Sequence, residues 1–224
     1  MAIKGTIFDA DGTLLDSMGV WSRLGEIYLD SLKIKSEPEL SAILFPMSLE
    51  EGSLYLKENY VPHLSREEIQ SGILDIICDF YKYEVKTKKG VPEFLENLRL
   101  KGIPAVIATA GDTSLLRAAL ERLGILCCFN GIYSCGELDT TKKSSYIYEF
   151  AARSMGTAAS ETVVFEDSLT AIKSAKRGGF YVVAVEDESS IAERCEIKKT
   201  ADNYIKDFFD LTDFLSADEN QPLK

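Results

Sequence analysis

Short apolar runs alternate with helical stretches through most of this chain, and this alternation is the strongest constraint on its fold. Buried strands that alternate with helices are typical of a parallel sheet covered on both faces. Glycines follow the helical stretches where a helix C-cap is expected. We therefore predict an α/β fold with a doubly wound, Rossmann-like parallel sheet. The predicted strands are residues 3–8, 104–108, 131–134, 162–165 and 181–185, and the predicted helices are residues 92–100, 113–123, 145–155 and 169–177.

The segment from Ser17 to Lys86 interrupts this alternation. It contains no strand-like run, and apolar residues such as Ile69, Ile73 and Ile76 recur in it at helical spacing. The pattern predicts three or four amphipathic helices. About 70 residues are too many for a loop, so we predict a small all-α domain inserted after the first strand. The predicted domains are an α/β core of residues 1–16 and 87–216, a helical domain of residues 17–86 and a tail of residues 217–224.

Charge and cysteine content limit where the protein works and what it binds. The 224 residues include 36 acidic and 25 basic side chains, a formal net charge of −11. An acidic field repels phosphate backbones and anionic lipid, so we expect neither nucleic acid nor a membrane as partner. The five cysteines have no ligand-like spacing and indicate neither a zinc site nor a disulfide framework. A reducing cytoplasm is therefore the expected location.

Polar residues stand at the ends of three predicted strands. In an open parallel sheet ligands bind beyond the carboxyl ends of the strands, so these residues are expected at one edge. A lysine pair precedes the helix that leads into the fourth strand. The candidate set is Asp9, Asp11, Thr109, Glu166, Asp167 and the pair Lys142 and Lys143.

This residue set favours chemistry at a phosphate group. Clustered carboxylates repel one another in a partly dry site and need a cation, and oxygen-only ligands select a hard ion such as Mg²⁺. One carboxylate can attack phosphorus while a second acts as general acid and base. A hydroxyl beside backbone N–H groups can bind phosphoryl oxygens, and a lysine can neutralise their charge.

Three motifs resemble those of the haloacid dehalogenase superfamily. They are DADGTLLDS at residues 9–17, IATAGD at residues 107–112 and VVFEDSLTAIKSAKRGG at residues 163–179. The closest likeness is to the phosphatase and β-phosphoglucomutase-like branch, in which a helical cap is inserted after the first strand. The resemblance implies a Mg²⁺-dependent phosphatase that hydrolyses a small phosphorylated metabolite, such as a sugar phosphate, through an aspartyl-phosphate. A monomer would suffice, because such a cap covers the site of its own chain.

The resemblance also implies roles for the acidic residues. Asp9 matches the nucleophile and a magnesium ligand. Asp11 matches the general acid and base, with its backbone carbonyl also on the metal. Asp167 matches a further magnesium ligand, and Glu166 is expected to help at the metal directly or through a neighbouring group.

The resemblance implies the remaining site residues less directly. Thr109, beside Ala110, matches the phosphate-binding hydroxyl. The family's lysine pattern places Lys142 at the catalytic position when residues 148–152 lie on the following helix, but Ser145-Tyr146 replaces the usual Pro-Asp. Lys143 therefore stays open as the alternative. In the cap, Trp21 and Met47 are expected to help select the substrate.

Structural interpretations compete with these roles. Thr109 could instead cap the helix that begins near Asp112, Asp167 could cap the helix before Leu169, and Trp21 could be part of the cap core.

Other functions of the same residues also stay open. A phosphomutase would reorient a bisphosphate and favours cationic cap groups, which residues 18–21 and 45–49 do not offer. A dehalogenase lacks the second aspartate and the magnesium, and a phosphonatase would need a Schiff-base lysine in the cap. A non-enzymatic phospho-acceptor domain would be about half as long and would lack the inserted helices.

Overall fold

The computed structural model describes residues 3–211, and the predicted tail at residues 217–224 lies outside them. The chain divides into two compact units. One, here called the sheet unit, takes the chain up to Asp16 and again from Lys86 onward. The other, the helical unit, is Ser17–Val85. Within the described residues, none of the helices is long and apolar enough to cross a membrane.

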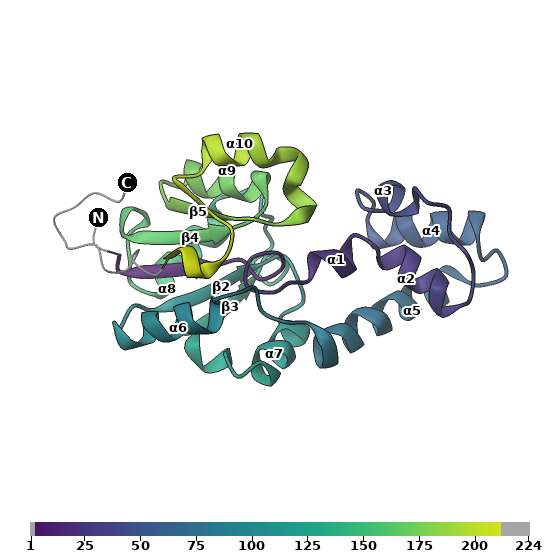
Figure 1. Cartoon of the computed structure of the whole chain (residues 1–224), viewed down its shortest axis with the longest axis horizontal. Helices are drawn as coiled ribbons and strands as arrows, with labels where there is room; N and C mark the ends of the chain where they lie inside the picture. The colour runs from purple at the N-terminus through teal and green to yellow at the C-terminus, as the bar shows by residue number, and fades with distance from the viewer. Residues whose placement is uncertain (1–2, 212–224) are drawn as a thin grey trace. The chain divides into compact units, whose positions relative to one another are not determined.

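The sheet unit is built on six parallel strands in the order β3-β2-β1-β4-β5-β6 (Figure 1). This confirms the predicted parallel α/β fold. β1 lies between β2 and β4, so the strand order reverses beside it, which is where such sheets bind ligands. The strands are β1 (Gly5–Phe8), β2 (Ala105–Thr109), β3 (Gly131–Ser134), β4 (Thr162–Glu166), β5 (Tyr181–Val185) and β6 (Asn203–Ile205).

Each face of the sheet is covered by apolar side chains. Ile7 and Val164 pack in one cluster with residues of α8, α9 and α10. On the other face Phe8 stacks on Phe165 with ring centroids 4.6 Å apart, and Phe94 of α6 packs edge-on against both rings. Figure 1 shows α9 and α10 together on one side of the strands and α6 on the other. The helices are α6 (Val91–Leu100), α7 (Thr113–Arg122), α8 (Tyr146–Ser154), α9 (Leu169–Arg177) and α10 (Arg194–Thr200), with short helical turns η2 (Leu126–Cys128), η3 (Ala159–Glu161), η4 (Glu188–Glu193) and η5 (Phe208–Leu211).

The helical unit contains more helices than the predicted three or four. Two of them, with four and five residues, are too short for an apolar periodicity to reveal them. Capping boxes begin the two longest helices, at Ser48 with Glu51 and at Ser65 with Glu68. Described helices of the unit are α1 (Met18–Trp21), α2 (Leu24–Ser31), α3 (Leu40–Leu44), α4 (Leu49–Asn59) and α5 (Arg66–Asp79), followed by the π-helical turn η1 (Phe80–Glu84).

A short two-stranded ribbon closes the sheet unit where the helical segment is inserted. Leu15 forms an antiparallel bridge with Thr87. The Lys88 amide donates to the Leu14 carbonyl at 2.9 Å, and the Asp16 amide donates to the Lys86 carbonyl at 2.9 Å. The two points at which the chain leaves and re-enters the sheet unit are therefore joined by backbone hydrogen bonds.

Candidate active site at the carboxyl edge of the sheet

The first site residue, Asp9, directly follows the fully buried strand β1 and is itself only 8% exposed. Its amide donates to the Phe165 carbonyl at 3.0 Å. The loop then turns tightly, because the Leu14 and Leu15 amides both donate to the Ala10 carbonyl. Gly12 has φ of 85°, a left-handed conformation that a side chain would strain. The sequence after β1 thus holds Asp9 over the end of the sheet.

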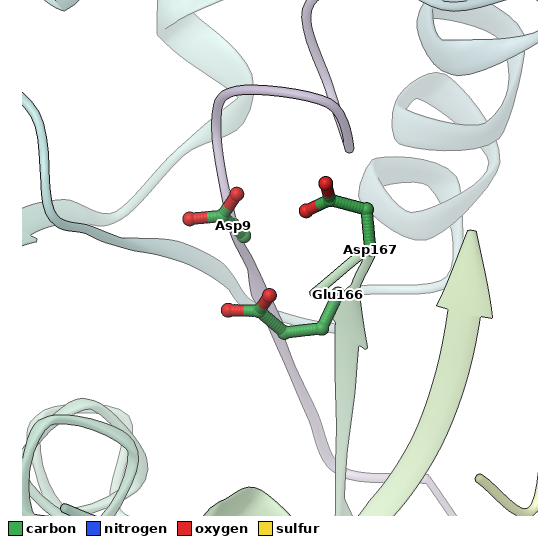
Figure 2. A group of neighbouring side chains, drawn as sticks. All are labelled: Asp9, Glu166 and Asp167. Atoms are coloured by element: carbon green, nitrogen blue, oxygen red, sulfur yellow. The ribbon is translucent and has the colours of Figure 1, made fainter. Parts of the chain in front are cut away.

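Three carboxylates meet at this edge. Asp9, Glu166 and Asp167 are all buried, and each offers an oxygen within 4.8 Å of the others. Figure 2 shows these side chains facing a common space, Asp9 from the end of β1 and the other two from the end of β4. Their proximity follows from the register, because Phe8 pairs with Phe165. We call these three residues the acidic group.

A single ammonium group faces two members of the acidic group. Lys142 Nζ donates to Asp9 Oδ1 at 2.8 Å and to Glu166 Oε1. The Tyr148 hydroxyl donates to the same Glu166 oxygen at 2.7 Å, and Lys142 Nζ lies 5.1 Å from the centre of the Tyr148 ring. Lys143 is exposed, and its carbonyl accepts a hydrogen bond from Arg177. Of the two lysines left open by the sequence, the structure places Lys142 at the acidic group.

Burial and mutual repulsion govern the ionisation of these side chains. Burial raises the pKa of Glu166 to about 7, against the attraction of Lys142. Burial also raises the pKa of Asp167 well above its ordinary value, and the charges of Asp9 and Glu166 raise it further. Burial would lower the pKa of Lys142, but the facing carboxylates hold it well above its ordinary value. Three buried carboxylates, two of them paired with one ammonium, form an oxygen-only donor set that fits a hard divalent cation such as Mg²⁺.

The other predicted loop residues also lie at this edge. Thr109 is buried at the end of β2, and its hydroxyl accepts a hydrogen bond from the Gly111 amide at 2.9 Å. A side chain on Gly111 would come within 3.4 Å of both Asp11 Oδ2 and Thr109 Oγ1, so these two groups flank the same glycine. Asp11 is half-buried and Ala110 is exposed. The side chain of Asp11 is outside the acidic group, so its predicted backbone contact with a metal stays a prediction.

The alternative capping interpretations are wrong. Asp112, rather than Thr109, caps α7 by accepting hydrogen bonds from the Ser114 and Leu115 amides. Ser168, rather than Asp167, caps α9. Asp167 is left to accept a hydrogen bond from the Thr13 hydroxyl at 3.3 Å.

The two predicted residues of the helical unit lie in different parts of it. Trp21 ends α1, is half-buried, and its indole N–H donates to the Tyr81 hydroxyl at 3.0 Å. This contact lies within the unit, as the interpretation of Trp21 as a packing residue requires. Met47 is half-buried in the loop before α4. A role of either residue in substrate selection stays a prediction.

Sequence reasoning missed two contributions to this edge. Tyr148 has no predicted role, although it shares Glu166 with Lys142. An ion pair between Lys88 and Asp187, with the two charged atoms 2.5 Å apart, joins residues 99 positions apart in the chain. The helical spacing of Tyr148 could have indicated that it faces the sheet, whereas no local pattern marks the ion pair.

Comparison with known proteins agrees with the motifs. A model of haloacid dehalogenase-like hydrolases matches residues 3–179. The chain belongs to this family, and the resemblance seen in the motifs is confirmed. It is therefore an enzyme, a hydrolase of the haloacid dehalogenase type.

Individual relatives are distant but cover most of the chain. YhcW of Bacillus subtilis is 25% identical over 184 residues, which are 82% of this chain and 83% of that protein. Validoxylamine A 7'-phosphate phosphatase of Streptomyces hygroscopicus subsp. limoneus is 25% identical over 203 residues, 85% of this chain and 90% of that protein. Among solved structures, a hydrolase of this family from Deinococcus radiodurans aligns with a TM-score of 0.76 and 20% identity, over 96% of this chain and 95% of that one.

Proposed function

We propose that this protein is a Mg²⁺-dependent phosphatase that hydrolyses a small phosphorylated metabolite through an aspartyl-phosphate on Asp9. The observation that carries the proposal is the buried acidic group with Lys142 hydrogen-bonded to Asp9 and Glu166. The family assignment and the Streptomyces relative named as a phosphatase support it. Asp9, Glu166 and Asp167, with the Asp11 carbonyl, are the proposed ligands of the cation, which would neutralise phosphoryl oxygens when bound.

Asp9 and Lys142 would perform the first half of the reaction. The Asp9 carboxylate attacks phosphorus, and a new bond forms from its oxygen as the bond between phosphorus and the leaving oxygen breaks. Lys142 donates to Asp9 Oδ1, so its charge lies where it can offset both the nucleophile and the phosphoryl oxygens. The buried hydroxyl of Thr109 and the amides that follow β2 would hold the phosphoryl group in line with Asp9.

Asp11 would move the protons. As the carboxylic acid it gives its proton to the leaving oxygen, which departs as an alcohol. As the carboxylate it then takes a proton from the water that attacks the phosphorylated Asp9. That attack restores the free carboxylate and releases inorganic phosphate. Asp11 is half-buried and its carboxylate flanks Gly111 beside Thr109, a location in keeping with this exchange.

The helical unit is proposed to act as the cap that selects the leaving group. The sheet unit carries the proposed reacting side chains, so the reaction type would be set there and the substrate identity elsewhere. Trp21 and Met47 are the proposed substrate-selecting residues of this cap. The protein is proposed to work as a monomer in the cytoplasm.

A phosphate-release screen tests the proposed function. The purified protein is assayed on sugar phosphates, nucleotides and small phosphorylated acids, with Mg²⁺ and with a chelator. We expect release of phosphate from at least one class of monoester, its loss with the chelator and its return with excess Mg²⁺. Full turnover in the chelator would contradict the metal-dependent mechanism. Isomerisation of a sugar phosphate without phosphate release would favour the phosphomutase instead.

A further inference from the structure

In addition to the acidic group and Lys142, the sheet unit contains a buried ion pair between Lys88 and Asp187. Lys88 Nζ lies 2.5 Å from Asp187 Oδ2, and the two side chains are only 15% and 5% exposed. Lys88 also donates to the Glu186 carbonyl at 3.2 Å. The other oxygen of Asp187 accepts hydrogen bonds from the amide and the hydroxyl of Ser189, at 2.9 and 2.7 Å. Both charged groups are therefore fixed in place.

This pair lies close enough to the acidic group to act on it. Asp187 follows β5, which pairs with β4 so that Ala184 faces Glu166. β5 ends at Val185, so Asp187 stands at the same edge of the sheet as Asp167, where the like charges of the two carboxylates repel one another. The amide of Lys88 is bonded to the Leu14 carbonyl, in the loop that begins at Asp9. The pair is thus connected to both segments that supply the acidic group.

Stability alone does not account for such a pair. Burying two charges often costs more free energy than their mutual attraction returns. Apolar residues of similar size can therefore replace a buried ion pair without loss of stability. The pair does have a defined electrostatic effect on the neighbouring carboxylates of the acidic group. With both charges present they nearly cancel, whereas Asp187 alone would add a fourth negative charge beside the acidic group, and Lys88 alone would oppose the binding of a cation.

We propose that Lys88 and Asp187 form a positioning pair that sets how tightly the acidic group binds its divalent cation. The inference rests on the proposed function, because it requires that Asp9, Glu166 and Asp167 bind Mg²⁺. Lys88 masks the charge of Asp187, and Asp187 fixes Lys88 at the end of β5, so the cation is bound without being held too strongly to exchange.

Titration calorimetry of Mg²⁺ in the absence of substrate, at low ionic strength, tests this pair. Lys88→Met should bind Mg²⁺ about threefold to tenfold more tightly, because it unmasks a negative charge within reach. Asp187→Asn should bind it more weakly by a similar factor. The double variant Lys88→Met/Asp187→Asn should return close to the parental affinity. Lys89→Met removes the same charge from the exposed neighbouring position and is the matched control, with a change within about twofold.

Opposite shifts of the Mg²⁺ affinity in the two single variants support the proposed role of the pair, since a purely structural role would weaken Mg²⁺ binding in both. Weaker binding in both single variants, or no shift in either, overturns it. Thermal unfolding of each variant shows whether it is folded. If Lys88→Met does not fold, Asp187→Asn and the double variant still test the proposal. Mg²⁺ binding should then be weaker in Asp187→Asn and close to the parental affinity in the double variant. Parental protein that binds no Mg²⁺ overturns the proposed function as well, whereas parental binding with unshifted variants overturns the pair alone.

Discussion

The sheet unit and the helical unit differ in which side chains they bury and which they expose. In its described part the sheet unit buries four carboxylates, those of Asp9, Glu166, Asp167 and Asp187, and pairs three of them with Lys142 or Lys88. In the described part of the helical unit the buried polar residues are only Ser17 and Ser53. Of the eleven large apolar side chains that are exposed among residues 3–211, seven belong to the helical unit: Leu32, Ile43, Phe45, Leu49, Leu54, Leu74 and Tyr83.

This contrast separates two tasks. Buried, hydrogen-bonded charges are costly to rearrange, so the sheet unit keeps the proposed reacting groups in one geometry. Exposed apolar side chains can contact a ligand without rearranging the core, so the helical unit can vary its surface freely. Substitutions in the sheet unit should therefore change the rate of reaction, and substitutions in the helical unit should change the choice of substrate.

The largest expected effect is that of Asp9→Asn. An amide is a far poorer nucleophile than a carboxylate at phosphorus, so no phosphoenzyme should form and kcat should fall by more than about 10⁴-fold. Rapid-quench measurement of covalent phosphate checks this. Covalent phosphate in the variant at the parental level would show that another residue is the nucleophile.

Asp11→Asn should have the next largest effect. The nucleophile remains, but leaving-group protonation and water activation are lost, which together contribute about 10²–10⁴-fold to kcat. Steady-state hydrolysis of an alkyl phosphate measures the loss. The effect should be smaller with an aryl phosphate, whose leaving group departs without protonation. Parental rates on both esters would remove Asp11 from the mechanism.

Lys142→Met and Lys143→Met make a matched pair of charge deletions. Loss of Lys142 removes the ammonium facing Asp9 and Glu166, and we expect kcat to fall by about 10²–10³-fold. It should also lower the thermal stability of the metal-free protein, because two buried carboxylates lose their counter-charge. The exposed Lys143 should be replaceable with little change in either measurement. Equal losses in the two variants would contradict the assignment.

The smallest expected effects are in the helical unit. Trp21→Phe and Met47→Ala should change the ratio of kcat/KM between two phosphate esters by several-fold while leaving aryl phosphate hydrolysis nearly unchanged. Ser48→Ala is the control, because loss of this helix cap should cost about 1 kcal/mol of stability without changing substrate preference. A lower melting temperature with unchanged preference in Trp21→Phe would assign Trp21 to packing, through its contact with Tyr81.

Sequence patterns predicted several elements of the sheet unit at their observed bounds. The strands at residues 131–134 and 181–185 and the helix at residues 169–177 have the expected bounds, because their apolar patterns mark the sheet and its cover. The strand β6 was missed, since three residues with a polar Asn203 give no such pattern. The π-helical turn η1 was also missed, because it follows α5 directly and Phe80 keeps the right-handed helical conformation between them.

The sequence could predict the positions of site residues that directly follow strands. It could not predict those that are set by contacts between distant parts of the chain. Asp9, Thr109 and Asp167 could be assigned to one edge because parallel strands end there together. The family's lysine pattern favoured Lys142 but left Lys143 open, since adjacent residues differ only in which way the loop turns them. The pairing of Lys88 with Asp187 depends on the register of the ribbon against the end of β5, which neither segment's own sequence specifies.

The ribbon formed by Leu15 and Thr87 makes the helical segment exchangeable. The chain leaves the sheet unit and returns to it across a pair of hydrogen-bonded residues, so the ends of any inserted segment are already held together. The entropy of closing such a loop grows only with the logarithm of its length. A shorter, longer or unrelated helical segment could therefore replace Ser17–Val85 at little cost to the sheet, with Asp9 left where it is. In evolutionary terms, this chain could acquire a new substrate by replacing one continuous segment of its gene, without disturbing the residues proposed to break the phosphate ester.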